Sequence, residues 1–368
     1  MKKVYIKAYT KFNLGNDLFI RALCNRYSDV KFYLVADEKY KEAFKDIKNL
    51  EVKFVNKSLI QKVLKLENKK DFDSLCKSTL KKCKSLVYVG GDIFVEPDYH
   101  KFEKLDILKD DISKVDNAYI ISANFGPYET DSYYEYINQK IIPKLKSICF
   151  RDKYSFEKFN DNKNVRYAPD VVFSMDFSKY KVEPKKEIGI SIINHLERKN
   201  IKEYYEKYQN KIIEIIKYYT KLGYKIKLFS FCEYEKDDEA IREIIEKIDD
   251  TTYTNNIEIV KYTGDIDKFL NAFASVEILF ATRFYSMILG FKLINKVVPI
   301  CYSEKLVNTL HDINFEGNYY NFYNVDKLDY VEIKDSNLNM NKIKKDATEQ
   351  FLDLDRAFKP VYFKVKQD

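Results

Sequence analysis

Residues 278–302 read ILFATRFYSMILGFKLINKVVPICY, and this stretch decides the fold that the sequence predicts. The runs 278–283 and 297–302 are short and apolar, which is typical of strands buried on both faces of a sheet. Residues 284–296 lie between them and are apolar over a length that suits a helix. A strand, a helix and a second strand in this order predict a parallel βαβ unit with a right-handed crossover.

The same alternation of short apolar runs and longer helical patterns extends through the chain. The runs predicted as strands are 4–9, 31–36, 51–56, 85–90, 118–123, 147–152, 165–173, 187–193, 225–231, 257–262, 278–283 and 297–302. The polar stretch 176–187 separates two groups of about six strands each. We therefore expect an α/β fold of two Rossmann-like domains that face a cleft. Their predicted bounds are 1–178 and 186–340, and residues 341–368 are expected to form a C-terminal helix that crosses back to the first domain.

The composition excludes several classes of protein. Nine glycines and seven prolines in 368 residues are too few for a collagen-like, linker-like or Pro-rich disordered chain. The net charge is +7, from 64 basic and 57 acidic residues, and the lysines are spread through the chain. Because no basic stripe is present, we expect no nucleic-acid partner. The mild positive charge fits anionic substrates or a loose approach to an anionic membrane surface.

The cysteines and the N-terminus predict the compartment. Six cysteines and three histidines show no spacing typical of a metal site, and several cysteines lie in apolar runs. We expect buried free thiols in a reducing compartment. No apolar segment has the length of a signal peptide core at the N-terminus or of a membrane span elsewhere, and no GxGxxG fingerprint occurs. The sequence therefore predicts a cytoplasmic protein with no metal and no resident cofactor.

Glycines and small polar residues follow three predicted strands of the first domain. They lie in the segments NLGND (13–17), VGGD (89–92) and NFGPY (124–128). Because the carboxyl ends of parallel strands meet at one edge of a sheet, these segments indicate one ligand-binding crevice. The alternative for the first segment is an ordinary βα turn with an Asn or Asp cap, and the alternative for the second is a tight turn. The candidate binding residues are Asn13, Gly15, Asn16, Asp17, Gly90, Gly91, Asn124 and Gly126, and Asp92 is a candidate catalytic carboxylate.

Two arginines stand just past predicted strands. Arg151 either clamps an anion with its planar fork or pairs with Asp152 or Asp170 as a structural brace. Arg283 ends a buried strand and precedes an apolar helix, where a charged side chain needs a partner or a ligand. The helix dipole and the guanidinium both favour an anionic group at that point.

Four further residues are candidates because of their positions. Tyr285 and Ser286 fall in the first helical turn after the strand 278–283. Lys305 follows the last predicted strand, where it either adds a positive charge to the site or is a solvated lysine. His195 follows the predicted strand 187–193 at the level of the expected cleft, and the alternative is a surface or capping histidine.

Together these segments resemble the polysaccharide pyruvyl transferase family. The resemblance rests on short motifs in the family's order over about residues 13–305: NLGND, VGGD, NFGPY, CFRDKYS, YAPDVVFSM, GISI, ATRFYSMILGF and PICYSEK. It implies a GT-B-like fold and the transfer of a pyruvyl group from phosphoenolpyruvate to two hydroxyls of a sugar, which forms a ketal and releases phosphate. It also implies a bacterial enzyme of capsular or other cell-surface polysaccharide synthesis. The glycan acceptor would be lipid-linked or nucleotide-linked, and the enzyme would associate peripherally with the inner face of the cell membrane.

One position departs from the family's pattern. The family usually has Arg-x-His at the strand end of the second domain, but here Tyr285 stands at the histidine position. Histidine titrates near neutral pH and acts as acid or base, whereas tyrosine is a poor base at pH 7. We therefore expect Arg283 to hold the donor's carboxylate or phosphate. Tyr285 would act as a weaker acid or orient a ligand, and His195 could supply the missing imidazole.

This departure leaves two alternatives to pyruvyl transfer. The first is a glycosyltransferase of GT-B type, in which the same arginines would hold the diphosphate of a nucleotide-sugar donor. The second is a non-catalytic relative that binds a glycan without turning over either donor. The loss of the histidine is the feature of the sequence that supports this second alternative.

Overall fold

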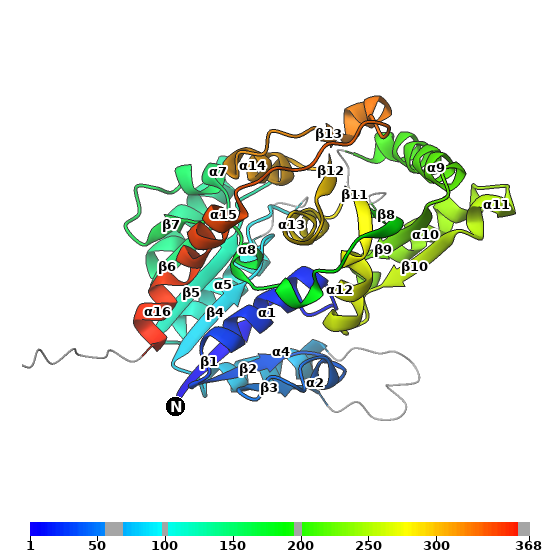
Figure 1. The fold of residues 1–368 in the computed structure, drawn as a ribbon. Helices are drawn as coiled ribbons and strands as arrows, with labels where there is room; N and C mark the ends of the chain where they lie inside the picture. Colours follow the sequence, from blue (N-terminus) through cyan, green and yellow to red (C-terminus); the bar gives the residue numbers. More distant parts are fainter. Residues whose placement is uncertain (56–68, 98–101, 195–200, 360–368) are drawn as a thin grey trace, which may run out of the picture. The chain divides into compact units, whose positions relative to one another are not determined.

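The computed structural model describes residues 1–55, 69–97, 102–194 and 201–359, which form two compact units (Figure 1). The first unit comprises Met1–Thr10, Leu18–Val171 and the chain from Lys345 onward. The second unit comprises Lys11–Asp17 and Val172–Lys344. The grouping of residues 11–17 with the second half of the chain has no counterpart in the predicted bounds 1–178, 186–340 and 341–368.

The first unit contains a seven-stranded sheet in the order β3-β2-β1-β4-β5-β6-β7, and every paired strand is parallel. Its strands are β1 (Lys2–Lys7), β2 (Val30–Val35), β3 (Leu50–Lys53), β4 (Ser85–Val89), β5 (Asn117–Ala123), β6 (Ser147–Phe150) and β7 (Val165–Tyr167). The strand order reverses between β1 and β4, as it does in Rossmann folds, and such a switch point opens a crevice at the carboxyl ends of the strands.

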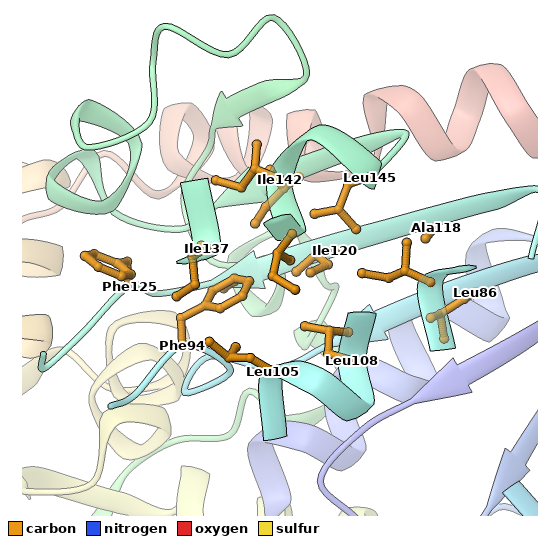
Figure 2. Close-up of a cluster of buried hydrophobic side chains, with 14 of the residues drawn as sticks. Leu86, Phe94, Leu105, Leu108, Ala118, Ile120, Phe125, Ile137, Ile142 and Leu145 are labelled. Carbon is orange, nitrogen blue, oxygen red and sulfur yellow. The ribbon is translucent and has the colours of Figure 1, made fainter. Parts of the chain in front are cut away.

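Helices cover both faces of this sheet. Side chains alternate along a strand, so Tyr119 and Ile120 of β5 point to opposite faces. Ile120 packs in a cluster with Leu105 and Leu108 of α5 (Glu103–Ser113), and Figure 2 shows this cluster. Tyr119 contacts the ring of Phe358, the last residue of α16 (Leu352–Phe358), at a centroid distance of 5.9 Å. Both faces are therefore buried, as the continuous apolar runs predicted.

The second unit contains a six-stranded sheet in the order β10-β9-β8-β11-β12-β13, also parallel throughout. Its strands are β8 (Lys185–Ser191), β9 (Lys225–Ser230), β10 (Ile257–Lys261), β11 (Val276–Ala281), β12 (Lys296–Cys301) and β13 (Tyr320–Asn321). The switch point of this sheet lies between β8 and β11. The predicted α/β class with two Rossmann-like sheets is confirmed. The short strand β13 was missed, because two residues give no detectable periodicity.

Each strand is joined to the next along the chain by a segment that contains a helix. In the first half of the chain they are α1 (Leu14–Arg26), α2 (Tyr40–Ala43), α4 (Lys69–Leu80), α5 (Glu103–Ser113), α6 (Asp131–Tyr136), a π-helical turn (Ile137–Ile141), α7 (Lys153–Glu157) and α8 (Val171–Ser174). In the second half they are α9 (Tyr205–Lys221), α10 (Asp237–Glu246), α11 (Thr251–Thr254), α12 (Ile266–Ala274), α13 (Phe284–Leu293), α14 (Glu304–Asp312), α15 (Met340–Ala347) and α16 (Leu352–Phe358). Short 3-10 turns include Ile142–Lys144, Ser178–Tyr180, Lys202–Tyr204, Glu233–Glu235, Phe322–Lys327 and Thr348–Phe351.

The apolar helix α13 packs very closely on the second sheet at Gly290. A Cβ atom at Gly290 would lie 2.6 Å from Leu279 and 3.1 Å from Val297, which belong to β11 and β12. A larger residue at this position would force the side chains of Leu279 and Val297 to shift. The packing fixes the start of α13 at the carboxyl end of β11, where Arg283 lies.

The chain after Lys345 is tied to the first sheet by the buried side chain of Gln350. Its Oε1 accepts a hydrogen bond from the backbone N–H of Ser122 at 2.9 Å. Its Nε2 donates to the carbonyls of Phe150 at 3.1 Å and Ala168 at 2.6 Å. One amide thus satisfies backbone groups next to β5, β6 and β7, where an unpaired group would be costly.

We expect Gln350→Ala to lower the free energy of unfolding by about 2–3 kcal/mol. The Ser122 N–H and the Ala168 carbonyl would lose this partner in a buried place, whereas the Phe150 carbonyl keeps the N–H of Ala168. Urea unfolding followed by circular dichroism measures the change. Glu349→Ala is the matched control, since that side chain is exposed and the expected effect is within about 0.5 kcal/mol. Equal effects of the two substitutions would contradict this account.

Candidate functional site

Arg283 stands at the switch point of the second sheet, between the end of β11 and the start of α13. Ser191, the last residue of the neighbouring strand β8, ties the two strand ends together. Its Oγ accepts hydrogen bonds from the backbone N–H groups of Thr282 at 2.8 Å and Arg283 at 3.1 Å. The same Oγ lies 2.6 Å from the Oγ of Ser286. The backbone that carries Arg283 is therefore held rigidly at the place where α/β sheets bind ligands.

The guanidinium of Arg283 is held by two carboxylates. Asp237 is bidentate: Arg283 Nε donates to its Oδ2 at 3.0 Å, and Nη2 donates to its Oδ1. Arg283 Nη1 donates to Oε2 of Glu235 at 2.5 Å. The side chains of Arg283 and Asp237 are 7% and 0% exposed, whereas that of Glu235 is 27% exposed. Glu235 is thus the member of the trio that has access to water.

Backbone geometry brings the two carboxylates to one guanidinium. Lys236, between them, has a φ of 62° and so adopts the left-handed conformation, which is uncommon outside glycine. Asp237 begins α10, and its Oδ2 also accepts hydrogen bonds from the N–H groups of Phe231 and Cys232, both at 3.1 Å. Asp237 is therefore fixed by the backbone as well as by Arg283.

Burial and the neighbouring charges shift the pKa values of Asp237 and Arg283 in opposite directions. Burial raises the pKa of Asp237 to about 6, although Arg283 pulls it down. Burial alone would lower the pKa of Arg283, but the carboxylates of Asp237 and Glu235 outweigh burial and raise it well above its ordinary value. Arg283 therefore stays charged, and the proton that moves near neutral pH belongs to a carboxyl group.

The N-terminal segment 11–17 completes this site. Asn13 Nδ2 donates to Oε1 of Glu235 at 3.1 Å, and the N–H of Leu14 donates to the carbonyl of Phe231 at 3.3 Å. Asn13 Oδ1 caps α1 by accepting from the N–H of Gly15 at 3.2 Å. Asp17 Oδ2 accepts from the hydroxyl of Tyr262 at 2.7 Å. The sequence placed this segment with the strand ends of the first domain, but in the structure its contacts with Arg283's partners are made within the second unit.

Gly15 lies directly against the ring of Tyr285. A Cβ atom at Gly15 would come within 1.8 Å of Cδ2 and 2.3 Å of Cγ of that ring. The first turn of α1 and the first turn of α13 are therefore in contact at these two positions. Asn16 lies in the same turn of α1 and is partly exposed, and Ser286 is fully buried beside Tyr285.

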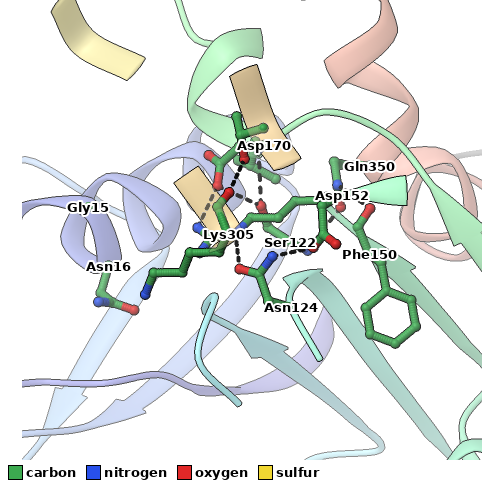
Figure 3. A network of polar contacts seen from close by, with 12 residues as sticks. Gly15, Asn16, Ser122, Asn124, Phe150, Asp152, Asp170, Lys305 and Gln350 are labelled. Carbon is green, nitrogen blue, oxygen red and sulfur yellow. Dashed lines mark hydrogen bonds and ion pairs between the residues drawn. The ribbon is translucent and has the colours of Figure 1, made fainter. Parts of the chain in front are cut away.

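The first unit contains a second buried network, around Arg151, and Figure 3 labels its members Asn124, Asp152 and Asp170. Arg151 Nη1 donates to Oδ2 of Asp170 at 2.9 Å, and Nε donates to Oδ1 of Asn124 at 2.5 Å. Asn124 Nδ2 donates in turn to Asp152, whose Oδ1 caps α7 by accepting the N–H of Ser155 at 2.8 Å. All of these side chains are at most 3% exposed. In this structure Arg151 braces the ends of β5, β6 and β7.

The remaining candidates of the first unit lie around this brace. A Cβ atom at Gly91 would come within 2.2 Å of Nη2 of Arg151, so glycine is needed there. The carbonyl of Gly91 accepts the N–H of Asn124 at 2.8 Å. Gly90 and Gly126 have positive φ values of 152° and 92°. Asp92 follows at the carboxyl end of β4 and is exposed, at the switch point of the first sheet.

Two further candidates lie elsewhere or beyond the described residues. Lys305, in the first turn of α14, is partly exposed, and its Nζ lies 5.4 Å from the centroid of the Tyr302 ring. His195 falls outside the described residues. Within the described ranges no group of His, Cys, Asp or Glu side chains is arranged to hold a metal ion.

Sequence reasoning missed Glu235 and Asp237, the two partners of Arg283. The signal that could have found them is the segment FCEYEKD (231–237), which follows the apolar run 225–231 and so begins at a strand's carboxyl end. An acidic pair at such a place is a candidate partner for a buried arginine predicted at another strand end of the same sheet.

A family model described as polysaccharide pyruvyl transferase matches residues 13–292, which is more than half of the chain. No curated protein gives a significant sequence match. None of the helices within the described ranges is long and apolar enough to cross a membrane.

Solved structures with a similar fold cover nearly the whole chain. HepE from Anabaena, in complex with UDP and glucose, has a TM-score of 0.54 at 10% identity, over 97% of this chain and 95% of HepE. The UDP-GlcNAc 2-epimerase of Methanocaldococcus jannaschii has a TM-score of 0.53 at 11% identity, over 96% of this chain and 100% of the epimerase. MnaA from S. aureus, solved with UDP, has a TM-score of 0.53 at 14% identity, over 97% of this chain and 90% of MnaA. These likenesses confirm the GT-B-like α/β fold.

We expect Gly15→Ala to lower the free energy of unfolding by about 1–3 kcal/mol, because its Cβ would overlap the ring of Tyr285. In a Tyr285→Ala background the same substitution should be neutral or stabilising, since alanine is the better helix former by up to about 1 kcal/mol. Urea unfolding of the wild type, both single variants and the double variant measures this coupling. The same cost in both backgrounds would show that the two positions are not in contact.

We expect Asp237 to make stability depend on pH between about pH 5 and pH 7. Its pKa, raised to about 6, means that the native state holds this proton more tightly than the unfolded chain does. The protonated Asp237 carboxyl therefore contributes its full stabilisation of the native state below the unfolded-state pKa. This stabilisation is lost as the pH rises through about 6. The unfolding free energy of the wild type, relative to Asp237→Asn, should fall by about 1 kcal/mol between pH 5 and pH 7. Urea unfolding across this range tests it, and a difference that does not change with pH would contradict it.

Proposed function

Because the chain belongs to the polysaccharide pyruvyl transferase family, we propose that it transfers a pyruvyl group from phosphoenolpyruvate to two hydroxyls of a sugar in a cell-surface polysaccharide. The family match over residues 13–292 carries this proposal. It spans both groups of candidate residues, from the NLGND segment to the helix that follows Arg283. Capsular polysaccharide of a bacterium is the product class that this family membership favours.

The proposed reaction sets the chemical demands on the site. Two acceptor O–H bonds, the C–O bond to phosphate and the π bond of the enol break, while two C–O bonds, one C–H bond and one O–H bond on the released phosphate form. One acceptor proton ends on the methylene carbon of the donor, which becomes a methyl group. The other leaves with phosphate as hydrogenphosphate. The enzyme therefore needs an anion site for the donor, an acid for the carbon and a base for the acceptor.

Arg283 and Glu235 support a donor site in the second unit. The two carboxylates already compensate the positive charge of Arg283. A highly charged anionic donor would therefore gain little binding free energy while both carboxylates stay bound to Arg283. Asp237 is fully buried and held by backbone N–H groups, but Glu235 is partly exposed and bonds through a single oxygen to Arg283. A donor carboxylate or phosphate that displaces Glu235 would take over Nη1 of Arg283 at the start of α13, where the helix dipole also favours an anion.

Further residues have roles in the same proposal. Tyr285, at the family's histidine position, stands against Gly15 beside Arg283, which suits a proton donor or a group that orients the donor. Exposed Asp92, at the switch point of the first sheet, suits a base for the acceptor hydroxyl. Asn13, Asn16, Ser286 and Lys305 are proposed as binding residues. Arg151, Asn124 and Gly91 are proposed to shape the strand ends that bind the acceptor.

We propose that the enzyme works in the cytoplasm, at the inner face of the cell membrane. Phosphoenolpyruvate is present in the cytoplasm, so a cytoplasmic enzyme could use it as the donor. A lipid-linked glycan acceptor would bring the enzyme to the inner face of the cell membrane. No resident cofactor or metal is part of the proposed chemistry, since the acid, the base and the anion site are all supplied by side chains.

We expect phosphoenolpyruvate to raise the melting temperature of the full chain, and Glu235→Gln to increase that shift. Removing one negative charge beside Arg283 should strengthen donor binding by about tenfold, or about 1.4 kcal/mol. Arg283→Lys keeps a charge but loses the planar fork, so the shift should disappear. Thermal melts with increasing phosphoenolpyruvate measure both effects. Release of phosphate from phosphoenolpyruvate, dependent on hexosides with two free neighbouring hydroxyls, tests turnover.

The controls for this experiment separate the three functions. Arg242→Lys changes an exposed arginine of α10 and should leave the shift unchanged. A shift with UDP or a nucleotide sugar but none with phosphoenolpyruvate would support the glycosyltransferase alternative and overturn pyruvyl transfer. Glycan binding without a shift from either donor would support the non-catalytic alternative.

A further inference from the structure

A pocket of about 530 Å³ lies at the amino-terminal edge of the first sheet, away from the carboxyl ends that carry the candidate residues. It is lined by the starts of β1, β4 and β5 and by the end of α16. Loops that bind substrate sit at the carboxyl edge of a parallel sheet. The proposed reaction therefore gives this pocket no role.

The rim of the pocket is strongly basic. Four lysines and one aspartate line it, which gives a net charge of +3 from these side chains: Lys2, Lys3, Lys82, Lys84 and Asp116. All five residues are exposed. Their convergence follows from the topology, because residues far apart in the sequence lie at or just before the starts of neighbouring parallel strands. The sequence alone showed only lysines spread through the chain.

Two buried aromatic side chains line the pocket, together with the polar residues Ser85 and Asn117. Tyr119 is 3% exposed and Phe358 is 7% exposed, and both line the pocket. Phe358 also contacts the ring of Tyr27 at 5.4 Å, and the hydroxyl of Tyr27 donates to Asp355 at 2.7 Å. Phe358 is therefore held by the rings of Tyr27 and Tyr119, and Lys2 Nζ donates to the carbonyl of the adjacent Ala357.

We propose that this basic-rimmed pocket docks the protein on an anionic phospholipid bilayer. Exposed lysines are flexible point charges, which suit a diffuse layer of phosphates, whereas a single tightly held phosphate would call for a buried arginine fork. The two aromatic side chains suit the glycerol and upper acyl part of a lipid that enters between the lysines. Each lysine close to an anionic surface strengthens binding appreciably.

This docking surface does not depend on the proposed pyruvyl transfer. It occupies the edge of the first sheet opposite to Gly91, Asp92 and Asn124, so a bound membrane leaves those strand ends uncovered. The surface would recruit the protein to the bilayer whatever reaction it performs there.

The test is sedimentation of the full chain with vesicles of phosphatidylglycerol and, separately, of phosphatidylcholine. We expect at least tenfold tighter binding to the anionic vesicles. The double variant Lys82→Ala/Lys84→Ala should bind them about 30-fold more weakly, which corresponds to about 1 kcal/mol for each lysine. The matched control Lys207→Ala/Lys221→Ala removes the same charge from exposed positions of α9 and should bind within about twofold of the wild type.

Several results would overturn the proposal. The first is equal binding to both vesicle types, and the second is an equal loss of binding in the two double variants. The third is release of the protein from the vesicles by millimolar glycerol phosphate at constant ionic strength, which would identify a free phosphate as the ligand. Tight binding of single-stranded RNA that is lost in Lys82→Ala/Lys84→Ala would assign the surface to nucleic acid instead. Thermal melts of both double variants establish that they are folded.

Discussion

The bidentate ion pair between Arg283 and Asp237 is the interaction on which the second unit's site depends. A guanidinium that follows a buried strand and precedes an apolar helix has no water to solvate it, so it must have a fixed counter-charge. Asp237 supplies that charge, and two backbone N–H groups fix Asp237 in turn. The loop after β9, the end of β11 and the segment 11–17 are all positioned through this pair and its neighbour Glu235.

The first unit meets the same physical requirement in a similar way. Arg151 follows β6, is 3% exposed and is matched by Asp170 and Asn124. Its surroundings are closed, because every carboxylate in the network already accepts several hydrogen bonds from buried groups. The trio around Arg283 differs in one respect, since Glu235 reaches water. That difference is why we assign ligand exchange to Arg283 and bracing to Arg151.

The sequence predicted the α/β class, the two parallel sheets and most of the strands, because buried strands leave continuous apolar runs that a linear pattern reveals. It also located Arg151, Arg283 and the pair Gly90 and Gly91 just past the ends of strands. It did not predict Glu235 or Asp237 as partners of Arg283. Charged residues in a loop follow no periodic pattern, so the sequence does not show which strand end they will lie beside. Nor did it predict that Gly15 lies against Tyr285, since contacts between two helix starts depend on how the strands are ordered in space.

The sequence by itself determined which residues are apolar, which strands must be buried and which residue types are available for chemistry, including the tyrosine at position 285. Only the tertiary structure decided which charges meet. The carboxyl ends of one sheet bring Arg283 to its carboxylates, and the amino ends of another bring four scattered lysines to one rim. The physical reason is that the sequence of each helix or strand shows by itself which of its residues are apolar and will be buried. Which charged side chains pair depends on the distance between them in space, and the order of the strands in the sheet sets that distance.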